Sequence, residues 1–581
     1  MDEKLLKIRH SLSHVLALAV KRIYGNVKLG IGPAIDNGFY YDFDFLDKKI
    51  EESDLKKIED EMKKIIYENQ DFIREEWSKD KAIEYFKKNG ENFKLELIDG
   101  IVQEHISVYK NGEFVDLCKG PHVLNTSELK NVGFKLSSLA GAYWRGSERN
   151  KMLTRIYGLA FENQEKLNEY IDFLNEAAKR DHRNIAKQMD LYSTNENVGA
   201  GLILWHPNGA IIRYEIENYW RQEHLKNGYK FIYTPHIGKE NLWKISGHLE
   251  FYKNAMYSPI SIDEINYYVK PMNCPFHIQI YKSKTRSYRD LPLRWAELGT
   301  VYRFEKAGVL HGLLRVRGFT QDDAHIICTP SQLETEVIEV LKFSLSIWKT
   351  FGFDDIKAYI STKPPDAIGD DNKWRTAQDT LIKAVNEIGL KYELDEGGGA
   401  FYGPKIDLKI KDAIGREWQT TTIQFDFNLP ERFEMEFSDS DGKLKRPYMI
   451  HRALLGSLER FFGILIEHYA GLFPLWLSPI QVYVLNITSK EEDYAKNIYN
   501  ELLRNEIRTD IDLSTQPISG KIRSALNYKP PYIIIVGEKE KQNNTISIKI
   551  RGNRNVYNIK LEEFITKIRE EIKLRSNNLS Y

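Results

Sequence analysis

The sequence is poor in several features that mark large classes of protein. Only three of its 581 residues are cysteines, Cys118, Cys274 and Cys328, which excludes a disulfide scaffold and predicts free thiols, as in a reducing cytosol. Net charge is lacking too, since 83 basic residues balance 83 acidic ones. Proteins that coat nucleic acid by charge alone are strongly basic, so any contact with RNA must come from local patches.

Long apolar runs are also missing. Residues 15–20 are apolar but are followed at once by two basic residues, whereas a secretory signal has a longer apolar core after a basic start. Residues 461–477 are interrupted by Glu467, His468 and Pro474, so they are too short to span a bilayer. We therefore expect a soluble, cytoplasmic protein. No P-loop or dinucleotide-binding glycine fingerprint is present either.

The chain has enough apolar sequence for several domains. Hydrophobic residues make up 42% and charged residues 29%, and at roughly 150 residues per domain the length predicts about four units. We place them at residues 1–160, 161–198, 199–477 and 478–581. The second is a linker with one helix over 163–188, and the last alternates strand and helix, which predicts a small α/β domain with a largely parallel sheet.

The third unit mixes helices and strands. The hydrophobic pattern predicts helices over residues 209–226, 333–351 and 451–469, and strands over 230–234 and 405–425. The helix over 451–469 is apolar on most faces, which predicts that it is buried.

Two histidines one helical turn apart form the first candidate site. His10 and His14 are four residues apart, so they share one face of a helix. Cys118 and His122 add a thiol and an imidazole, and Asp116 precedes them. The three imidazoles and the thiol suit tetrahedral zinc, but they also suit a metal-free hydrolytic pocket in which imidazoles position water.

A second possible metal set consists of Cys274, His325 and His451, the last at the start of the predicted buried helix. One thiolate and two imidazoles leave the fourth position of zinc open, as in catalytic zinc sites. Because the three residues are far apart in the sequence, their spacing alone gives little support.

Arginines in two contexts indicate a nucleotide. Arg303 ends a predicted strand, and Arg315 lies beyond a glycine-containing loop on the returning strand. Arginine suits phosphate because its fork binds two oxygens while it stays charged. On the predicted buried helix Arg460 needs an anionic or aromatic partner, either a ligand or one of two acids, Glu459 and Glu467.

With these motifs the sequence resembles the threonyl-tRNA synthetases of class II. Residues 272–275, 310–325 and 451–457 resemble the motifs that distinguish them from the seryl and prolyl enzymes, and residues 32–42 and 140–146 resemble their bacterial-type editing domain. The resemblance implies an α+β multidomain chain: an α+β editing domain, a class II antiparallel sheet with helices, and a C-terminal α/β anticodon-binding domain. Because His10 lies so near Met1, we expect the ubiquitin-like domain of many members to be absent.

The resemblance also implies an activity and partners. Such an enzyme activates L-threonine with ATP and Mg²⁺, transfers it to the 3′ end of tRNA(Thr), hydrolyses mischarged seryl-tRNA(Thr) and works as a homodimer with one zinc ion per subunit. The implied zinc ligands are Cys274, His325 and His451. The implied editing residues are His10, His14, Lys94, Asp116, Cys118 and His122, and we expect that pocket to work without metal.

The resemblance assigns the remaining roles residue by residue. The implied catalytic residues are Arg303, Arg460, His248, Gln321 and Asp323. The implied ATP contacts are Arg303, Glu305, Arg315, Phe319, Gln419, Thr422 and Arg460. The implied threonine contacts are Met272, Tyr402, Lys405 and Gln424. The implied anticodon contacts are Arg523, Glu540, Lys549 and Arg551.

Two functions from other classes agree with part of the sequence. A zinc hydrolase acting on small esters would use the first candidate site, but it leaves the three arginines without a role. An RNA-binding regulator derived from a synthetase would bind RNA without catalysis, although every residue matched to activation is present. Threonine-dependent exchange of pyrophosphate into ATP separates the three readings.

Overall fold

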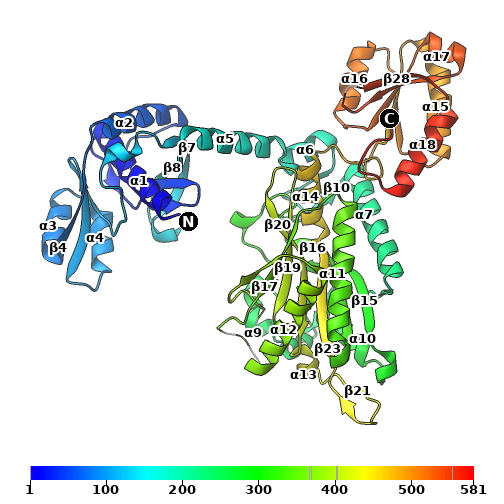
Figure 1. Ribbon diagram of the computed structural model, residues 1–581, viewed down its shortest axis with the longest axis horizontal. Helices are drawn as coiled ribbons and strands as arrows, with labels where there is room; N and C mark the ends of the chain where they lie inside the picture. Colours follow the sequence, from blue (N-terminus) through cyan, green and yellow to red (C-terminus); the bar gives the residue numbers. More distant parts are fainter. Residues whose placement is uncertain (1, 366, 368–369, 401–402, 553) are drawn as a thin grey trace. The chain divides into compact units, whose positions relative to one another are not determined.

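The computed structural model describes residues 2–365, 367, 370–400, 403–552 and 554–581. The chain divides into two compact units, Met1–Asn175 and Glu176–Tyr581. Figure 1 shows the helices and strands of both units. Among the described residues no helix is both long and apolar enough to cross a membrane.

The first unit contains two sheets. Helices α1 and α2 share a hydrophobic core with the strands of the larger sheet (Figure 1). Its elements are α1 (Glu3–Tyr24), β1 (Lys28–Leu29), β2 (Ala34–Ile35), β3 (Gly38–Asp44), α2 (Leu55–Tyr67), β7 (Gly133–Tyr143) and β8 (Met152–Phe161). The smaller antiparallel sheet is formed by β4 (Phe72–Ser78), β5 (His105–Asn111) and β6 (Phe114–Leu117), with α3 (Lys79–Lys88) and α4 (Asn92–Asp99).

The predicted linker helix over 163–188 is in fact two helices, α5 (Gln164–Lys179) and α6 (His182–Met189). The break has a local cause. Asp181 leaves the helical conformation, and its carboxylate accepts a hydrogen bond from the backbone N–H of Arg183 at 2.8 Å, which caps a new helix. The prediction of a single helix was therefore wrong at this point.

The second unit is built on an eight-stranded sheet that is antiparallel except at its two edges. In spatial order its strands are β11 (Lys230–Phe231), β15 (Leu293–Tyr302), β16 (Gly318–Cys328), β23 (Tyr448–Ser457), β20 (Glu417–Asp426), β19 (Lys405–Lys411), β17 (Ile356–Ser361) and β18 (Tyr392–Asp395). Helix α6 and four longer helices share a hydrophobic core with this sheet; the longer ones are α7 (Pro207–Lys226), α11 (Leu333–Thr350), α12 (Asp371–Ile388) and α14 (Leu458–Tyr469).

The sequence-based elements of this unit are largely confirmed, with one correction. The predicted helices over 209–226 and 333–351 and the strands within 405–425 are present. The predicted helix over 451–469 begins only at Leu458, and His451 lies on strand β23 instead. Strand β23 is paired on both sides, with β16 and β20. A strand covered on both faces has a continuous apolar pattern that cannot be told from a buried helix.

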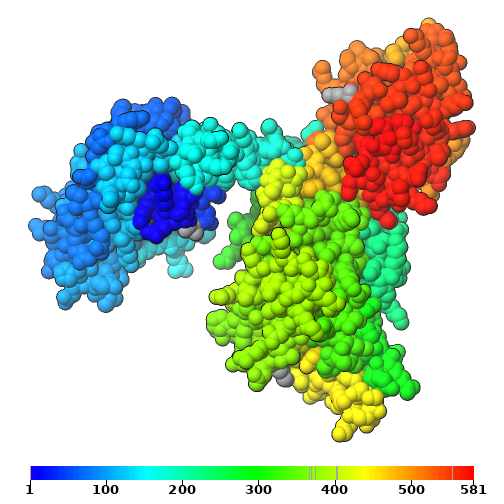
Figure 2. All heavy atoms as spheres, viewed as in Figure 1, coloured from blue at the N-terminus to red at the C-terminus, as the bar shows by residue number. Residues whose placement is uncertain are grey.

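The C-terminal part of the second unit has a five-stranded sheet. Its first three strands are parallel, as predicted, and an antiparallel hairpin extends them. The strands are β25 (Thr509–Asp512), β24 (Val482–Asn486), β26 (Tyr532–Val536), β27 (Ile546–Ile550) and β28 (Arg554–Ile559). The helices are α15 (Glu492–Arg504), α16 (Ile518–Leu526), α17 (Glu538–Asn543) and α18 (Leu561–Leu574), the last drawn in red in Figure 2.

Two helical glycines give a matched test of packing. Gly209 and Gly520 are each the third residue of their helix, α7 and α16. A Cβ on Gly209 would lie 2.0 Å from the backbone oxygen of Leu191, whereas one on Gly520 would meet only the end of the flexible Gln516 side chain at 3.3 Å. We expect Gly209→Ala to destabilise the fold by about 1–3 kcal/mol through overpacking.

Gly520→Ala serves as the control, and we expect it to be neutral or stabilising by about 0.5–1 kcal/mol because alanine favours the helix. Scanning calorimetry of the whole chain measures both variants. A Gly209→Ala protein that unfolds at or above the wild-type temperature would contradict the close approach of α7 to residue 191.

Candidate active sites

The central strand β16 presents four predicted site residues on one face. Side chains alternate along a strand, and the even-numbered residues from Ala324 to Cys328 enter the core. The odd-numbered residues line a cleft of about 710 Å³: Phe319, Gln321, Asp323 and His325. Strand periodicity thus places a row of functional side chains along one wall of a single cleft.

Neighbouring strands and loops bring most of the other predicted residues into the same cleft. His451 on β23 pairs with His325 on one side and with Gln424 on the other. The predicted residues that line the cleft besides those of β16 are Met272, Cys274, Arg303, Glu305, Arg315, Gln419, Thr422, Gln424, His451 and Arg460. They come from distant parts of the sequence, and those on β20 and β23 reach the cleft because β16, β23 and β20 are adjacent.

Two further predicted residues flank the cleft. Lys405 begins strand β19, and its ammonium group forms an ion pair with Asp407. His248 begins α9 (His248–Phe251) and lines a smaller cavity that shares Cys274 with the cleft. Burial, with Arg303 nearby, lowers the pKa of His248 to about 4, so its ring is neutral at pH 7. Tyr402 lies outside the described residues.

A buried carboxylate that the sequence analysis missed shapes the cleft end of β23. Gln321 pairs with Ser457 of β23, but Asp323 pairs with Ala453. Three residues of β23 therefore lie opposite the single residue Asp322, which makes a β-bulge. The Asp322 carboxylate accepts hydrogen bonds from the backbone N–H groups of residues 454, 455 and 456 at 2.9, 2.9 and 3.1 Å. Bulges of this kind redirect side chains beside active sites.

This bulge determines where the buried helix begins. Directly after it, the Ser457 hydroxyl accepts a hydrogen bond from the backbone N–H of Arg460 at 3.0 Å and caps α14. The cap places Arg460 in the first turn of α14, at the edge of the cleft.

The three predicted nucleotide-binding arginines have different partners. Arg315 donates to a carboxylate oxygen of Glu305 at 3.0 Å. The Arg303 guanidinium lies 5.1 Å from the ring centroid of Phe319. Burial and the neighbouring Arg315 lower the pKa of Arg460. Among the described residues no carboxylate lies within ion-pair distance of Arg303 or Arg460.

The protein acids proposed as partners of Arg460 are engaged elsewhere. Glu459 forms an ion pair with Arg213 at 2.9 Å. Glu467 accepts a hydrogen bond from Nδ1 of His182 and forms an ion pair with Arg416, both at 2.6 Å. The internal salt bridge that the sequence analysis left open for Arg460 is therefore wrong, and its positive charge faces the cleft.

The Cys274, His325 and His451 side chains come together at the opposite end of the β16 row. Their sulfur and one nitrogen of each ring all lie within 4.8 Å of one another, and Cys274 begins helix α10 (Cys274–Lys282). The Nε2 atom of His325 lies 2.9 Å from Nδ1 of His451.

Outer contacts orient these rings. His451 Nε2 lies 2.7 Å from a carboxylate oxygen of Asp426, to which it donates. His277 Nε2 donates to Glu297 at 3.1 Å, and His277 Nδ1 lies 2.7 Å from Nδ1 of His325.

One nitrogen of each ring therefore faces the other across 2.9 Å, beside a thiol. Burial holds the pKa of His325 well below its usual value, so its ring is uncharged. A thiolate with two imidazoles is a donor set that zinc prefers. The residues present thus fit a zinc ion.

The sequence analysis missed the outer partners His277, Glu297 and Asp426. A signal for the first existed, because His277 follows Cys274 by three residues on one helix and so shares its face. The other two lie on strands that only the folded sheet brings to the site.

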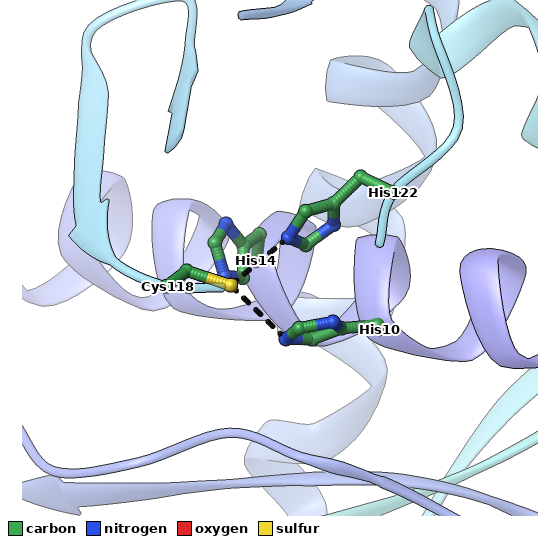
Figure 3. Close-up of side chains that lie close together, drawn as sticks. All are labelled: His10, His14, Cys118 and His122. Carbon is green, nitrogen blue, oxygen red and sulfur yellow. Dashed lines mark hydrogen bonds between the residues drawn. The ribbon is translucent and has the colours of Figure 1, made fainter. Parts of the chain in front are cut away.

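The first candidate site also assembles as predicted, in the first unit (Figure 3). The Cys118 sulfur lies 3.3 Å from Nε2 of His10 and 3.2 Å from Nε2 of His122. With His14 the four ligand atoms lie within 4.8 Å of one another. The two histidines of α1 share one face, as their spacing required.

A buried charged pair lies beside this quartet. The Lys94 ammonium is 2.5 Å from one carboxylate oxygen of Asp116, and the Tyr41 hydroxyl donates to the other at 2.5 Å. The same oxygen lies 3.8 Å from Nε2 of His14. Asp116 and Lys94, both predicted from the resemblance, thus lie next to the quartet and neutralise each other.

Burial keeps the quartet uncharged at neutral pH. It lowers the pKa of the three histidines and raises that of the Cys118 thiol to about 12. Among the described residues, the buried Nδ1 of His14 has no hydrogen-bond partner. A neutral pocket with an unpaired imidazole nitrogen can accept water or a polar group of a ligand.

The four predicted anticodon residues differ in how they are engaged. Glu540 accepts from a serine hydroxyl at 2.6 Å and from a backbone N–H at 2.9 Å, which caps α17. Arg551 donates to two backbone carbonyls of the segment before this domain, both at 2.7 Å. Lys549 is half-buried on β27, and Arg523 is exposed on α16.

Comparison with protein families agrees with this geometry. Residues 257–469 match the tRNA synthetase class II core domain (G, H, P, S and T), and residues 481–571 match an anticodon-binding domain. Residues 106–157 match the second additional domain of threonyl- and alanyl-tRNA synthetases. The fold and the cleft are those of a class II aminoacyl-tRNA synthetase.

Individual relatives show which amino acid the similar enzymes of this class are named for. The chain is 54% identical to the threonine–tRNA ligase of Aquifex aeolicus, over 98% of this chain and 90% of that one. It is 53% identical to the one from Borrelia hermsii, over 98% and 97%. The crystal structure of the RNA-binding domain of Cryptosporidium parvum threonyl-tRNA synthetase matches with a TM-score of 0.65 and 36% identity, over 69% of this chain and 99% of that one.

The chain therefore belongs to the threonine–tRNA ligase family. The resemblance stated from the sequence and the predicted fold class are both confirmed.

Proposed function

We propose that the chain joins L-threonine to tRNA(Thr) in two steps and removes serine attached by mistake. The observation that carries the proposal is the row of β16 side chains from Phe319 to His325. One end of this row lies at the arginines, and the other end lies at the group Cys274, His325 and His451. A nucleotide at one end and a metal-held amino acid at the other would meet between them, at Gln321 and Asp323. The row thus has the two ends that adenylate formation needs.

The arginine end is assigned to ATP, which would enter with Mg²⁺. Phe319 offers a ring to the adenine and Arg460 the opposite face, while Arg303 would hold the α-phosphate. Arg315 would exchange its ion pair with Glu305 for the outer phosphates, because a bidentate phosphate contact is the stronger one. Gln419 and Thr422, on β20, complete this part of the cleft.

The opposite end is assigned to zinc and threonine. Cys274, His325 and His451 would hold the ion, which when bound offers an open ligand position for the amino and hydroxyl groups of threonine. Asp426 and the His277–Glu297 pair keep the two rings oriented, as outer partners of metal ligands commonly do. The proposed amino-acid contacts nearby are Met272, Lys405 and Gln424. Tyr402 is also proposed as a contact, from the resemblance alone.

Transfer to tRNA is assigned to the region of His248. Its Nδ1 lies 2.7 Å from the Ser246 hydroxyl, and its Nε2 lies 3.1 Å from the sulfur of Met272. Because its ring is neutral at pH 7, it can accept a proton or a hydrogen bond from the terminal ribose without first losing one.

Selectivity explains why one chain carries two sites. Valine has the shape of threonine but no hydroxyl, so a metal that requires a hydroxyl ligand rejects it. Serine has the amino and hydroxyl groups and lacks only a methyl group, worth roughly 1–3 kcal/mol. The zinc site therefore admits serine at a low rate, and a second, hydrolytic site has to remove it.

We assign that hydrolysis to the quartet of the first unit, without metal. Zinc with one thiolate carries a net positive charge, and Asp116 and Lys94 already cancel each other, so the metal would leave an uncompensated buried charge. A neutral imidazole can instead position water against an ester that is already activated.

The anticodon loop is assigned to the C-terminal sheet. Arg523 and Lys549 offer positive charge for the phosphates of a single-stranded loop. Glu540 and Arg551 already have protein partners, so their contribution would be to shape this surface as well as to meet RNA.

Self-association and compartment complete the proposal. Exposed apolar side chains gather around β12 (Ile237–Lys239), β13 (Ile260–Ile262) and β14 (Ile265–Val269), and Tyr233 just before them is 80% exposed. We propose that a second copy of the chain covers them, because such exposed groups mark interaction sites. The free cysteines agree with a reducing cytoplasm.

Removal of Arg303 tests nucleotide activation. We expect Arg303→Ala to lower threonine-dependent exchange of pyrophosphate into ATP by at least about 100-fold, since a charged phosphate contact contributes about 3 kcal/mol. Arg289→Ala, a change at an exposed position where the side chain donates to the neighbouring Tyr288 hydroxyl, is the control. Wild-type exchange in the Arg303 variant would refute the assignment.

Removal of one thiol tests the zinc site. Elemental analysis of purified protein should find one zinc per wild-type chain and none in Cys274→Ser, which loses the thiolate ligand. Cys328→Ser is a matched control, because Cys328 is also buried in this unit but belongs to no candidate metal group among the described residues. Full zinc content in Cys274→Ser would remove this cysteine from the ligand set.

A double variant tests editing. With His10→Ala and His14→Ala, we expect normal threonine charging but hydrolysis of seryl-tRNA slowed by about 10²–10⁴-fold, the usual contribution of a positioned acid or base. His105→Ala, at an exposed histidine of the same unit, should hydrolyse it normally.

The outcomes separate three readings. Accumulation of seryl-tRNA by a folded double variant with unchanged metal content supports a metal-free pocket. Unfolding with loss of a second zinc would instead make the quartet a structural metal site, and an unchanged rate of seryl-tRNA hydrolysis would exclude both.

A further inference from the structure

A buried histidine outside both proposed sites touches the ATP-binding loop. His182 is the first residue of α6, and it is fully buried. Its Nδ1 lies 2.6 Å from a carboxylate oxygen of Glu467, and its Nε2 lies 3.1 Å from the backbone nitrogen of Leu313. Helix α6 packs on α14, which carries Glu467 (Figure 1), so the ring joins three segments of the second unit.

The two contacts determine the tautomer of this ring. The Leu313 N–H is a donor, so Nε2 of His182 must accept and carries no proton. Nδ1 carries the proton and donates it to Glu467. Both nitrogens are therefore used within the protein, and the Asp181, His182 and Glu467 cluster offers no imidazole lone pair to a metal ion.

Leu313 is the anchor of an otherwise exposed loop. Residues 306–309 are exposed, whereas Leu313 is completely buried. The turn that contains it is closed by backbone hydrogen bonds between His311 and Arg315, at 3.1 and 3.3 Å. Because Arg315 closes the turn whose tip is held by His182, a shift of the tip moves Arg315.

Two glycines show how closely these parts fit. A Cβ on Gly312 would lie 2.1 Å from Nε2 of His182, and a Cβ on Gly463 of α14 would lie 3.3 Å from the Cβ of Leu313. The turn thus lies directly against the ring on one side and against α14 on the other. Helix α14 also carries Arg460, two turns before Glu467.

We propose that His182 is a positioning residue for ATP. Its ring accepts a hydrogen bond from the Leu313 N–H and donates one to Glu467, and these two contacts fix the position of the turn that carries Arg315 relative to the helix that carries Arg460. This inference rests on the assignment of the two arginines to ATP. It gives the segment directly after the first unit a role in the activation site that neither the resemblance nor the sequence spacing indicated.

Two amide variants separate the two contacts of His182. In His182→Asn the side chain reaches the position of Nδ1 and keeps the contact with Glu467, but it falls short of Leu313. In His182→Gln the side chain oxygen reaches the position of Nε2 and can accept from Leu313. We expect kcat/KM for ATP in pyrophosphate exchange to fall about 10–100-fold in the Asn variant and to stay within about threefold of wild type in the Gln variant.

The KM for threonine and the rate of seryl-tRNA hydrolysis should be unchanged in both variants. Arg180→Ala is the matched control, because Arg180 ties the same segment to α14 through the carbonyls of Glu467 and His468 and does not touch the loop. We expect it to lower the unfolding temperature without changing the KM for ATP.

Each outcome decides the inference. Equal ATP kinetics in the Asn and Gln variants, or a defect only in the Gln variant, overturns it. If neither variant folds, Gly312→Ala approaches the same contact from the loop, and unchanged ATP kinetics in that variant overturns the inference as well. A wild-type protein without threonine-dependent exchange would refute the proposed function itself, which is a different result.

Discussion

The alternation of side chains along β16 is the constraint on which the rest of the catalytic cleft depends. Because β16 is an inner strand, one of its faces must be apolar to form the core with the helices, and only the other is left for function. The functional face presents Phe319, Gln321, Asp323 and His325 at regular spacing. The proposed adenine site and the proposed metal site are thereby kept at a fixed separation by the backbone of a single strand.

Around this strand, buried polar groups bend neighbouring backbone and orient the side chains of the cleft. Asp322 points away from the row and uses its carboxylate to bind three backbone N–H groups of β23. Helix α14 begins directly after the resulting bulge, and this brings Arg460 to the edge of the cleft. Asp426 and the His277–Glu297 pair orient the two imidazoles in a similar way. Burial makes such groups costly when unpaired, so each has a definite partner and a definite geometry.

The two proposed active sites use related residues under opposite electrostatic conditions. At His325 and His451 two ring nitrogens lie 2.9 Å apart beside a thiol, and the Asp426 carboxylate behind them can balance the charge of a cation. At Cys118 the neighbouring carboxylate of Asp116 is already neutralised by Lys94, so the pocket remains uncharged. The same side-chain types can therefore hold a metal in one place and position water in another, because their neighbours differ in charge.

The sequence by itself determined the family, the fold class and nearly all the side chains of the cleft, because motifs such as those at residues 310–325 record which residue types the chemistry needs. Only the tertiary structure decided that His451 lies on a strand, that Arg460 has no acidic partner among the described residues, and that Asp322 and His182 hold the site in place. These features arise from contacts between residues far apart in the chain, and local pattern carries no information about which distant group a buried side chain will meet.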